Sequence, residues 1–280
     1  MKIIRKAKEM QSLVSRIRRT RKKIGFVPTM GALHRGHLEL VSSANKNSDF
    51  TVVSIFVNPV QFGPGEDYGS YPRKAGKDIA LLKSCGVDAL FLPQVKEMYP
   101  QGFSTYVVPE GKFVETLCGA KRPRHFRGVD TVVAKLFNIV KPDIAFFGQK
   151  DAQQCAVIKR LVRDLNFDID IRIVPTVREK DGLAMSSRNL RLLPRQRKNA
   201  AGIYRSLMAA KKMMKSGVTK TEKIRETIKK MITEWGGEID YISFVNPETM
   251  EDLTTAVPPV MIAVAVRVGR VRLIDNIAVN

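Results

Sequence analysis

The sequence predicts an α/β fold: a Rossmann-like, doubly wound parallel sheet followed by a second, smaller α+β domain. Over residues 1–176, short and nearly continuous apolar runs alternate with stretches of helical periodicity. This alternation is typical of a parallel sheet that helices cover on both faces. After about residue 176 the order changes to helices followed by a strand pair. We therefore expect two domains, 1–176 and 177–280.

The elements of the first domain follow in order along the chain. The basic N-terminal segment has apolar residues at spacings that favour an amphipathic first helix, namely Ile3, Ile4, Met10, Leu13, Val14 and Ile17. Buried strands are expected at 23–29, 50–57, 88–92, 143–147 and 169–174, with another short strand at 104–109. Helices are expected through 38–44, 73–84, 129–140 and 152–164, and a loop rich in Gly and Pro fills 58–72.

The second domain begins with two helices, over roughly 194–215 and 219–234. A strand at 241–245 follows, and then a strand pair that turns at Gly269 and Arg270. Helices that precede an antiparallel strand pair indicate a small α+β domain.

Composition narrows the class of protein. The net charge is +21, but the basic residues are spread along the chain and no nucleic-acid recognition motif accompanies them, so most of them are expected to be solvated. The three cysteines are isolated, and no C-x-x-C pair occurs, which favours reduced thiols in the cytoplasm. No membrane-spanning run or secretory signal is visible; a basic N-terminal transit peptide is the alternative. We expect a cytoplasmic protein with no membrane and no specific nucleic-acid partner.

Two of the three histidines stand three residues apart, as His34-Arg35-Gly36-His37, directly after the strand at 23–29. Residues three apart share a helix face, and the first turn of a helix offers free N–H groups and a positive dipole end to an anion. Gly36 lets a ligand approach the backbone. These features indicate a phosphate site. A zinc site has no further ligands nearby, and G-x-G-x-x-G and P-loop motifs are absent. Taken alone, the pair could also be two surface histidines.

H-x-G-H after a strand is the ATP signature of class I aminoacyl-tRNA synthetases and of related nucleotidyltransferases, where it is called the HIGH motif. Five stretches in order resemble the pantothenate synthetase (pantoate–β-alanine ligase) family: VPTMGALHRGH, VSIFVNPVQF, FFGQKDAQQ, PTVREKDGLAMSSRN and LIDNIAV. The resemblance covers the chain from about Ile24 to its end. It implies a ligase of coenzyme A (vitamin B5) biosynthesis that joins (R)-pantoate to β-alanine. ATP with Mg²⁺ forms a pantoyl adenylate, and AMP and pyrophosphate are released. It also implies a homodimer.

The resemblance also implies roles for residues. His37, His34, Lys150 and Arg188 are the expected catalytic residues. Gln61 and Gln154 are expected to bind pantoate, Gln61 also β-alanine, and no protein metal ligand is expected. ATP is expected to contact Met30, Gly31, Ala32, Leu33, His34, Arg35, Gly36, His37, Gly148, Gln149, Lys150, Asp151, Val177, Met185, Ser186, Ser187 and Arg188. The smaller domain is expected to close on this site.

Several alternatives stay open. Lys150 and Asp151 could form an ordinary helix start, Ser186 and Ser187 could be helix caps, and the segment 121–127 could be a solvated turn. The chain departs from the family pattern at Arg35, Gln149 and Ala152, beside the expected site residues. The competing functions are a nucleotidyltransferase, which would leave a nucleotide on its product, and a basic nucleic-acid-binding protein.

Overall fold

The computed structural model describes all 280 residues, which divide into two compact units. The first unit is Met1–Glu110, Arg122–Gln149 and Val157–Pro175, and the second is Gly111–Lys121, Lys150–Ala156 and Thr176–Asn280. Two short segments that precede residue 176 therefore pack with the second unit. Gln153 connects them: its side chain donates to the carbonyls of Phe113 and Thr116, 2.9 Å each, and accepts from the Cys118 amide at 2.9 Å.

The first unit is built on a six-stranded sheet whose order is β1-β4-β3-β2-β5-β6, and every neighbouring pair is parallel. The strands are β1 (Lys2–Ile4), β2 (Ile24–Thr29), β3 (Phe50–Ile55), β4 (Ala89–Phe91), β5 (Ile144–Gly148) and β6 (Asp170–Val174). The chain runs from β2 outward through β3 to β4 and then crosses back to β5 on the other side of β2. This reversal is the position at which doubly wound sheets bind ligands, at the carboxyl ends of the strands.

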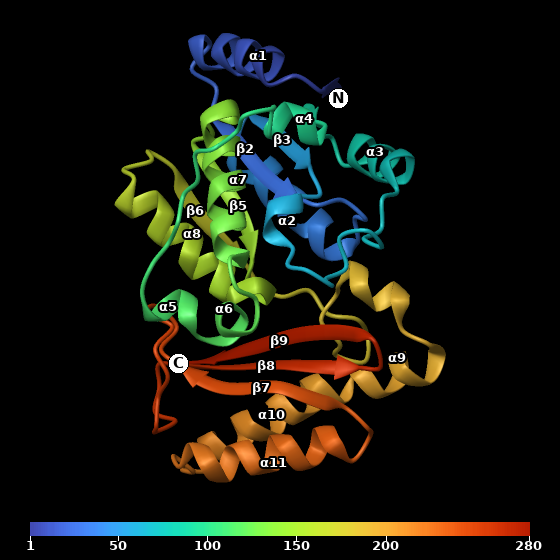
Figure 1. Cartoon of the computed structure of the whole chain (residues 1–280), viewed down its shortest axis with the longest axis vertical. Coiled ribbons are helices and arrows are strands. Elements are labelled where there is room, and N and C mark those ends of the chain that lie inside the picture. The colour runs from blue at the N-terminus through green and yellow to red at the C-terminus, as the bar shows by residue number, and fades with distance from the viewer. The chain divides into compact units, whose positions relative to one another are not determined.

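Helices of the first unit cover both faces of its sheet (Figure 1). They are α1 (Ala7–Arg19), α2 (Arg35–Asn47), α3 (Ala75–Ser84), α4 (Val95–Met98), α7 (His125–Val140) and most of α8 (Ala152–Asp164). Successive residues of a strand point to opposite faces. Accordingly Val27 belongs to the cluster that includes Leu40 of α2, whereas the Phe26 ring lies against Phe137 of α7 with centroids 6.4 Å apart. The doubly wound architecture predicted from the apolar strands is confirmed.

The second unit has a three-stranded antiparallel sheet in the order β7-β8-β9. Its strands are β7 (Glu238–Val245), β8 (Val260–Val268) and β9 (Val271–Val279), and its helices are α5 (Lys112–Glu115), α6 (Leu117–Lys121), α9 (Pro194–Ala200), α10 (Gly202–Lys215) and α11 (Thr221–Thr233). Helices α10 and α11 pack on the sheet (Figure 1). Their buried apolar residues, among them Leu207 and Ile228, form one core with β8.

Three element predictions were wrong. Ile3 and Ile4 do not belong to the first helix, because they form β1 and pair with Leu90 and Phe91 of β4. The segment 104–109 is not a strand; the Thr131 hydroxyl is 3.0 Å from the Val107 amide and 3.4 Å from its carbonyl. The helix expected over 194–215 is two helices, α9 and α10, interrupted at Ala201.

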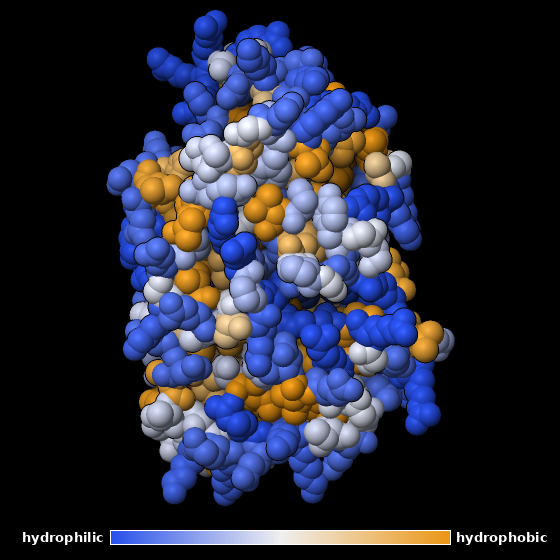
Figure 2. Space-filling view, in the orientation of Figure 1, coloured by the Kyte–Doolittle hydropathy of each residue, from blue (hydrophilic) through white to orange (hydrophobic).

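Helix α1 is amphipathic, as predicted, with Met10, Leu13 and Val14 buried. Its exposed side chains are mainly hydrophilic, and they dominate the top of Figure 2. None of the helices combines the length and the apolar character that crossing a membrane requires.

Candidate active site

The loop that follows the central strand β2 has an uncommon backbone conformation. Gly31 and Ala32 both have positive φ angles, +83° and +51°. A side chain at Gly31 would place its Cβ 2.9 Å from Ile55 Cγ2, so both the conformation and the space favour glycine there. The Thr29 hydroxyl accepts a hydrogen bond from the Gly31 amide at 3.1 Å. The chain therefore turns sharply at the carboxyl end of β2.

A buried carboxylate holds this turn. Asp78 of α3 is 2% exposed, and its two oxygens accept hydrogen bonds from the amides of Ala32 and Leu33, at 2.8 and 2.9 Å. Hydrogen bonds to a carboxylate are stronger than neutral ones. Asp78 thus fixes the two peptides that precede His34. Asp78 is not among the site residues predicted from the sequence.

The two histidines cap helix α2. The Gly36 amide donates to His34 Nδ1 at 3.1 Å, and the His34 amide donates to His37 Nδ1 at 3.3 Å, so the pair forms a capping box. The ring centroids are 4.0 Å apart. Because each Nδ1 accepts a hydrogen bond, the proton of each neutral ring is assigned to Nε2. Two Nε2–H donors therefore belong to the helix terminus at which an anion is expected.

Gln61 lies at the end of η1 (Pro59–Gln61) in the loop after β3, beside the loop just described. Its Nε2 is 3.2 Å from the sulfur of Met30, and its Oε1 accepts from Asn58 Nδ2 at 3.1 Å. Asn58 Nδ2 also donates to the Gly128 carbonyl, at 2.9 Å. A Cβ on Gly128 would lie 2.5 Å from Gln61 Cα, so glycine is required for helix α7 to approach η1 this closely.

His125 and Arg122 support Gln61 from the other side. Arg122 Nη1 donates to His125 Nε2 at 2.9 Å, which leaves the proton on Nδ1, and Nδ1 donates to the Gln61 carbonyl at 2.8 Å. Glu66 pairs with both Nε and Nη2 of Arg122, at 2.7 and 2.6 Å. Burial raises the pKa of Glu66, but the hydrogen bond and charge of Arg122 outweigh it and keep that pKa below its usual value. The segment 121–127 therefore includes a built network and is not only a solvated turn.

Other predicted site residues of the first unit lie at the same edge of the sheet. Strand β5 is the neighbour of β2; it ends at Gly148, and Gln149 begins η2 (Gln149–Asp151). Because parallel strands end at the same edge, Gly148 and the loop 30–34 leave the sheet on the same side.

The remaining predicted residues belong to the second unit. Lys150 Nζ lies 3.2 Å from Asp151 Oδ1, and Gln154 follows on the first turn of α8. The stretch from Val177 to Met185 is a hairpin, closed by the Met185 amide donating to the Val177 carbonyl at 3.0 Å. The Ser186 hydroxyl accepts from the Arg188 amide at 3.2 Å and caps η3 (Ser187–Arg191). The alternative of Ser186 as a helix cap therefore holds for that residue.

Comparison with known proteins connects this geometry to a family. The family model described as pantoate-beta-alanine ligase matches residues 2–278. The chain belongs to the pantoate–β-alanine ligase family.

Individual ligases of this family are similar over the full chain. The pantothenate synthetase of Thermosipho africanus is 54% identical over 279 residues, covering 100% of both chains, and that of Acetivibrio thermocellus is 50% identical over 281 residues with the same coverage. The crystal structure of the Thermus thermophilus pantothenate synthetase superposes with a TM-score of 0.94 at 46% identity, covering 99% of each chain. The Francisella tularensis ligase, complexed with β-γ ATP and β-alanine, has a TM-score of 0.83 at 36% identity and covers 99% of this chain and 97% of its own.

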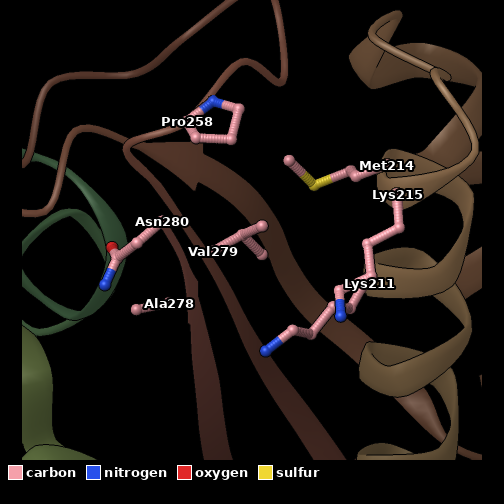
Figure 3. Close-up of a pocket in the computed structure, with 7 residues that line it drawn as sticks. All are labelled: Lys211, Met214, Lys215, Pro258, Ala278, Val279 and Asn280. Carbon is pink, nitrogen blue, oxygen red and sulfur yellow. The ribbon is translucent and has the colours of Figure 1, made fainter.

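A cavity of about 330 Å³ in this ligase is lined by none of the predicted site residues. Figure 3 shows that Lys211 and Met214 of α10 face Val279 of β9 across it. All of its lining residues belong to the second unit, and none was predicted to bind substrate.

Proposed function

We propose that this ligase condenses (R)-pantoate with β-alanine to form pantothenate, in two steps that consume ATP. In the first step the pantoate carboxylate attacks the α-phosphorus of ATP, and the bond to pyrophosphate breaks. In the second, the amine of β-alanine attacks the acyl carbon of the pantoyl adenylate and AMP leaves. The observation that carries the proposal is the pair of Nε2–H donors on His34 and His37, at the N-terminus of α2 and the end of the central strand.

The phosphate chain of ATP fits this helix terminus. Negative charge develops on pyrophosphate as it leaves, so donors that are already oriented lower the barrier. His34 and His37 supply two such donors, and in this proposal His37 donates to the leaving group. Lys150 adds a compact positive charge, and Arg188 adds a fork of donors for phosphate oxygens. Ser186 and Ser187 begin the loop that carries Arg188.

The rest of the nucleotide is assigned to neighbouring residues. Gly148 and Val177 line the adenosine, and Asp151 accepts from a ribose hydroxyl. In the loop before His34, Met30, Gly31, Ala32 and Leu33 border the phosphates; Arg35, Gly36, Gln149 and Met185 complete the set. The nitrogen donors of this set suit phosphate oxygens and not Mg²⁺, which prefers oxygen. Mg²⁺ would therefore be held by phosphate oxygens and water, and it would neutralise phosphate charge.

Pantoate is assigned to Gln61 and Gln154, and β-alanine to Gln61. A primary amide can bond both the hydroxyls and the carboxylate of pantoate. A neutral amide also leaves the carboxylate free of a paired cation, so the carboxylate remains nucleophilic. Gln61 suits this task because Asn58, Met30 and His125 already fix its position.

An exchange assay tests the proposal. With pantoate and ATP but no β-alanine, labelled pyrophosphate is expected to enter ATP, because the first step is reversible before the amine arrives. Exchange without pantoate is the matched blank. Exchange that needs β-alanine would overturn the free adenylate. A product that keeps the nucleotidyl group in place of released AMP would identify a nucleotidyltransferase.

We also propose that the ligase acts in the cytoplasm as a homodimer. The three cysteines are isolated in the sequence and no C-x-x-C pair occurs, which supports a reducing compartment. Sedimentation equilibrium tests the assembly, with twice the chain mass of 31.4 kDa expected.

A further inference from the structure

The motif LIDNIAV near the end of the chain has a clear pattern but no role in the steps above. Its two polar residues, Asp275 and Asn276, are adjacent on β9 and are only 3% and 5% exposed. Successive side chains of a strand point to opposite faces. The two residues therefore contact different parts of the second unit.

Asp275 forms an ion pair with Arg178, the second residue of the hairpin 177–185. Arg178 Nη1 lies 2.6 Å from Asp275 Oδ2, and Nη2 lies 3.0 Å from Oδ1, so the pair is bidentate. Arg178 also stacks on the Tyr204 ring, with its guanidinium carbon 3.9 Å from the ring centroid. Burial raises the pKa of Asp275, and the hydrogen bond and charge of Arg178 oppose that rise. The Asp275 carboxylate is therefore held by the Arg178 guanidinium and by the backbone amide of Asn276.

The hairpin 177–185 connects Arg178 to the segment that carries Arg188. Arg178 forms a bridge with Ala184, and its Nη1 donates to the Gly182 carbonyl at 3.0 Å. The chain enters η3 three residues after Ala184, and η3 contacts β9. The backbone that carries Arg188 is therefore anchored to β9 through the Asp275–Arg178 pair.

Asn276 anchors the backbone of Lys150, the other predicted phosphate-binding cation. Its Nδ2 donates to the Lys150 carbonyl at 2.9 Å, and its own amide donates to Asp275 Oδ1 at 2.8 Å. The anchors of Lys150 and of the hairpin are therefore consecutive residues of one strand, connected by a hydrogen bond.

We propose that Asp275 and Asn276 are positioning residues that set the distance between Lys150 and Arg188. The inference rests on the proposed function, in which both cations bind phosphate. Two cations that act on one phosphate chain need a fixed spacing, because a displacement of about 1 Å can cost about a hundredfold in rate. A hydrogen-bonded strand supplies that spacing better than the two loops alone.

The test uses three variants of the full chain. Asn276→Ala removes the bond to Lys150, Arg178→Lys keeps the charge but loses the bidentate fork, and Asp275→Asn removes the carboxylate. The matched control is Asp240→Asn, which breaks the 2.7 Å ion pair between Asp240 of β7 and Arg272 of β9. That pair belongs to the same sheet but contacts neither Lys150 nor the hairpin.

Two half-reactions are measured for each variant: pantoate-dependent pyrophosphate exchange, and aminolysis of supplied pantoyl adenylate by β-alanine. We expect kcat for exchange to fall about 10- to 100-fold in each of the three variants. The rate of aminolysis, in which pyrophosphate takes no part, is expected to stay within about threefold of the rate of the unmodified protein. The control Asp240→Asn is expected to leave the rates of both half-reactions unchanged. Thermal unfolding shows whether each variant is folded. If Asp275→Asn does not fold, Asn276→Ala still decides the outcome, because it leaves no charge unpaired.

Equal losses in both half-reactions, or unchanged exchange in Asn276→Ala, would overturn the positioning role. Lys150→Gln and Arg188→Ala are measured beside these variants. If those two keep full exchange, the proposed function is wrong in its phosphate contacts. If they lose exchange while the β9 variants keep it, only the present inference fails.

Discussion

At the scale of single residues, some side chains of the candidate site could be predicted from the sequence and others could not. The His34–His37 pair was visible because its spacing is local and because it follows an apolar strand. Asp78 left no such signal: it lies on a helix more than 40 residues away, and only the folded chain brings it to the loop 30–34. Asn58 and His125 have no predicted role, and the structure shows that both hold Gln61.

Changing Gln61 to Ala is expected to weaken the use of pantoate much more than the binding of ATP. The loss should exceed that of an exposed hydrogen bond, about 0.5–1.5 kcal/mol, because Asn58 loses a buried partner. KM for pantoate and Kd for ATP are measured for Gln61→Ala and Gln154→Ala, with exposed Gln101→Ala as the control. Equal losses of ATP affinity in the first two variants would remove both glutamines from the pantoate site.

Asp130 predicts how stability depends on pH. The residue is 2% exposed, its Oδ1 has no hydrogen-bond partner, and burial raises its pKa to about 8. The unfolded chain ionises this carboxyl near pH 4. Its contribution to stability is therefore full below pH 4 and is lost as pH rises toward 8, by up to about 1.4 kcal/mol per pH unit.

Asp130→Asn removes this loss, so the variant is expected to gain stability over the parent as pH rises from 5 to 8. Urea unfolding at four pH values in this range measures the difference, and exposed Asp168→Asn is the control. A difference between variant and parent that stays constant with pH would contradict the raised pKa of Asp130.

At the scale of elements, helices and strands are predicted best where the hydrophobic periodicity of the sequence agrees with the burial of its residues. The strand expected at 23–29 is β2, Ile24–Thr29, because its apolar run is flanked by a basic segment and a Pro-Thr pair. The strand β1 was missed because three residues with two isoleucines are indistinguishable from the edge of the helix that follows. The segment 104–109 has strand composition, but its partner is the Thr131 side chain and not another strand.

The loop between β2 and α2 is expected to depend on Asp78. In Asp78→Asn one oxygen becomes an NH₂ group that faces an amide donor, and Ala32 holds a φ of +51° that costs about 1 kcal/mol without support. We expect kcat/KM for ATP in the exchange assay to fall about 10- to 100-fold, because both histidines shift with the loop.

The matched control for Asp78→Asn lies at the other end of the same strand. Asp143 Oδ2 accepts from the Ile24 amide at 2.7 Å, so Asp143→Asn removes a similar bond without touching the loop. Exchange activity that falls equally in the two variants would show that the effect is general destabilisation of β2.

At the scale of the whole molecule, the residues predicted to bind ATP are divided between the two units. Met30–His37, Gly148 and Gln149 belong to the first, and Lys150, Asp151, Val177 and Met185–Arg188 belong to the second. The predicted boundary at residue 176 places Lys150 in the first domain, because the hydrogen bond from Asn276 Nδ2 to the Lys150 carbonyl is not visible in local sequence. We propose that ATP joins residues of both units and that the smaller domain closes on phosphate, which would exclude water from the adenylate.

Closure predicts that an ATP analogue slows hydrogen exchange in residues 181–190. Arg188→Ala is expected to reduce that protection and to lower adenylate formation at least tenfold, because a charged contact to phosphate is lost. Hydrogen exchange followed by mass spectrometry measures the protection, with α11 as an internal reference. Unchanged exchange on addition of the analogue, together with a fully active Arg188→Ala variant, would contradict closure.

The three residues of β1 have a consequence for how this protein behaves in concentrated solution. Strand β4 is fully buried, and β1 covers the edge that it would otherwise present to other molecules. An uncovered apolar edge strand is a template for pairing between molecules. Lys2 adds a positive charge to the edge that β1 presents, which disfavours such pairing. Loss of the first few residues by proteolysis would therefore reduce colloidal solubility well before it disturbed a site at the carboxyl ends of the strands.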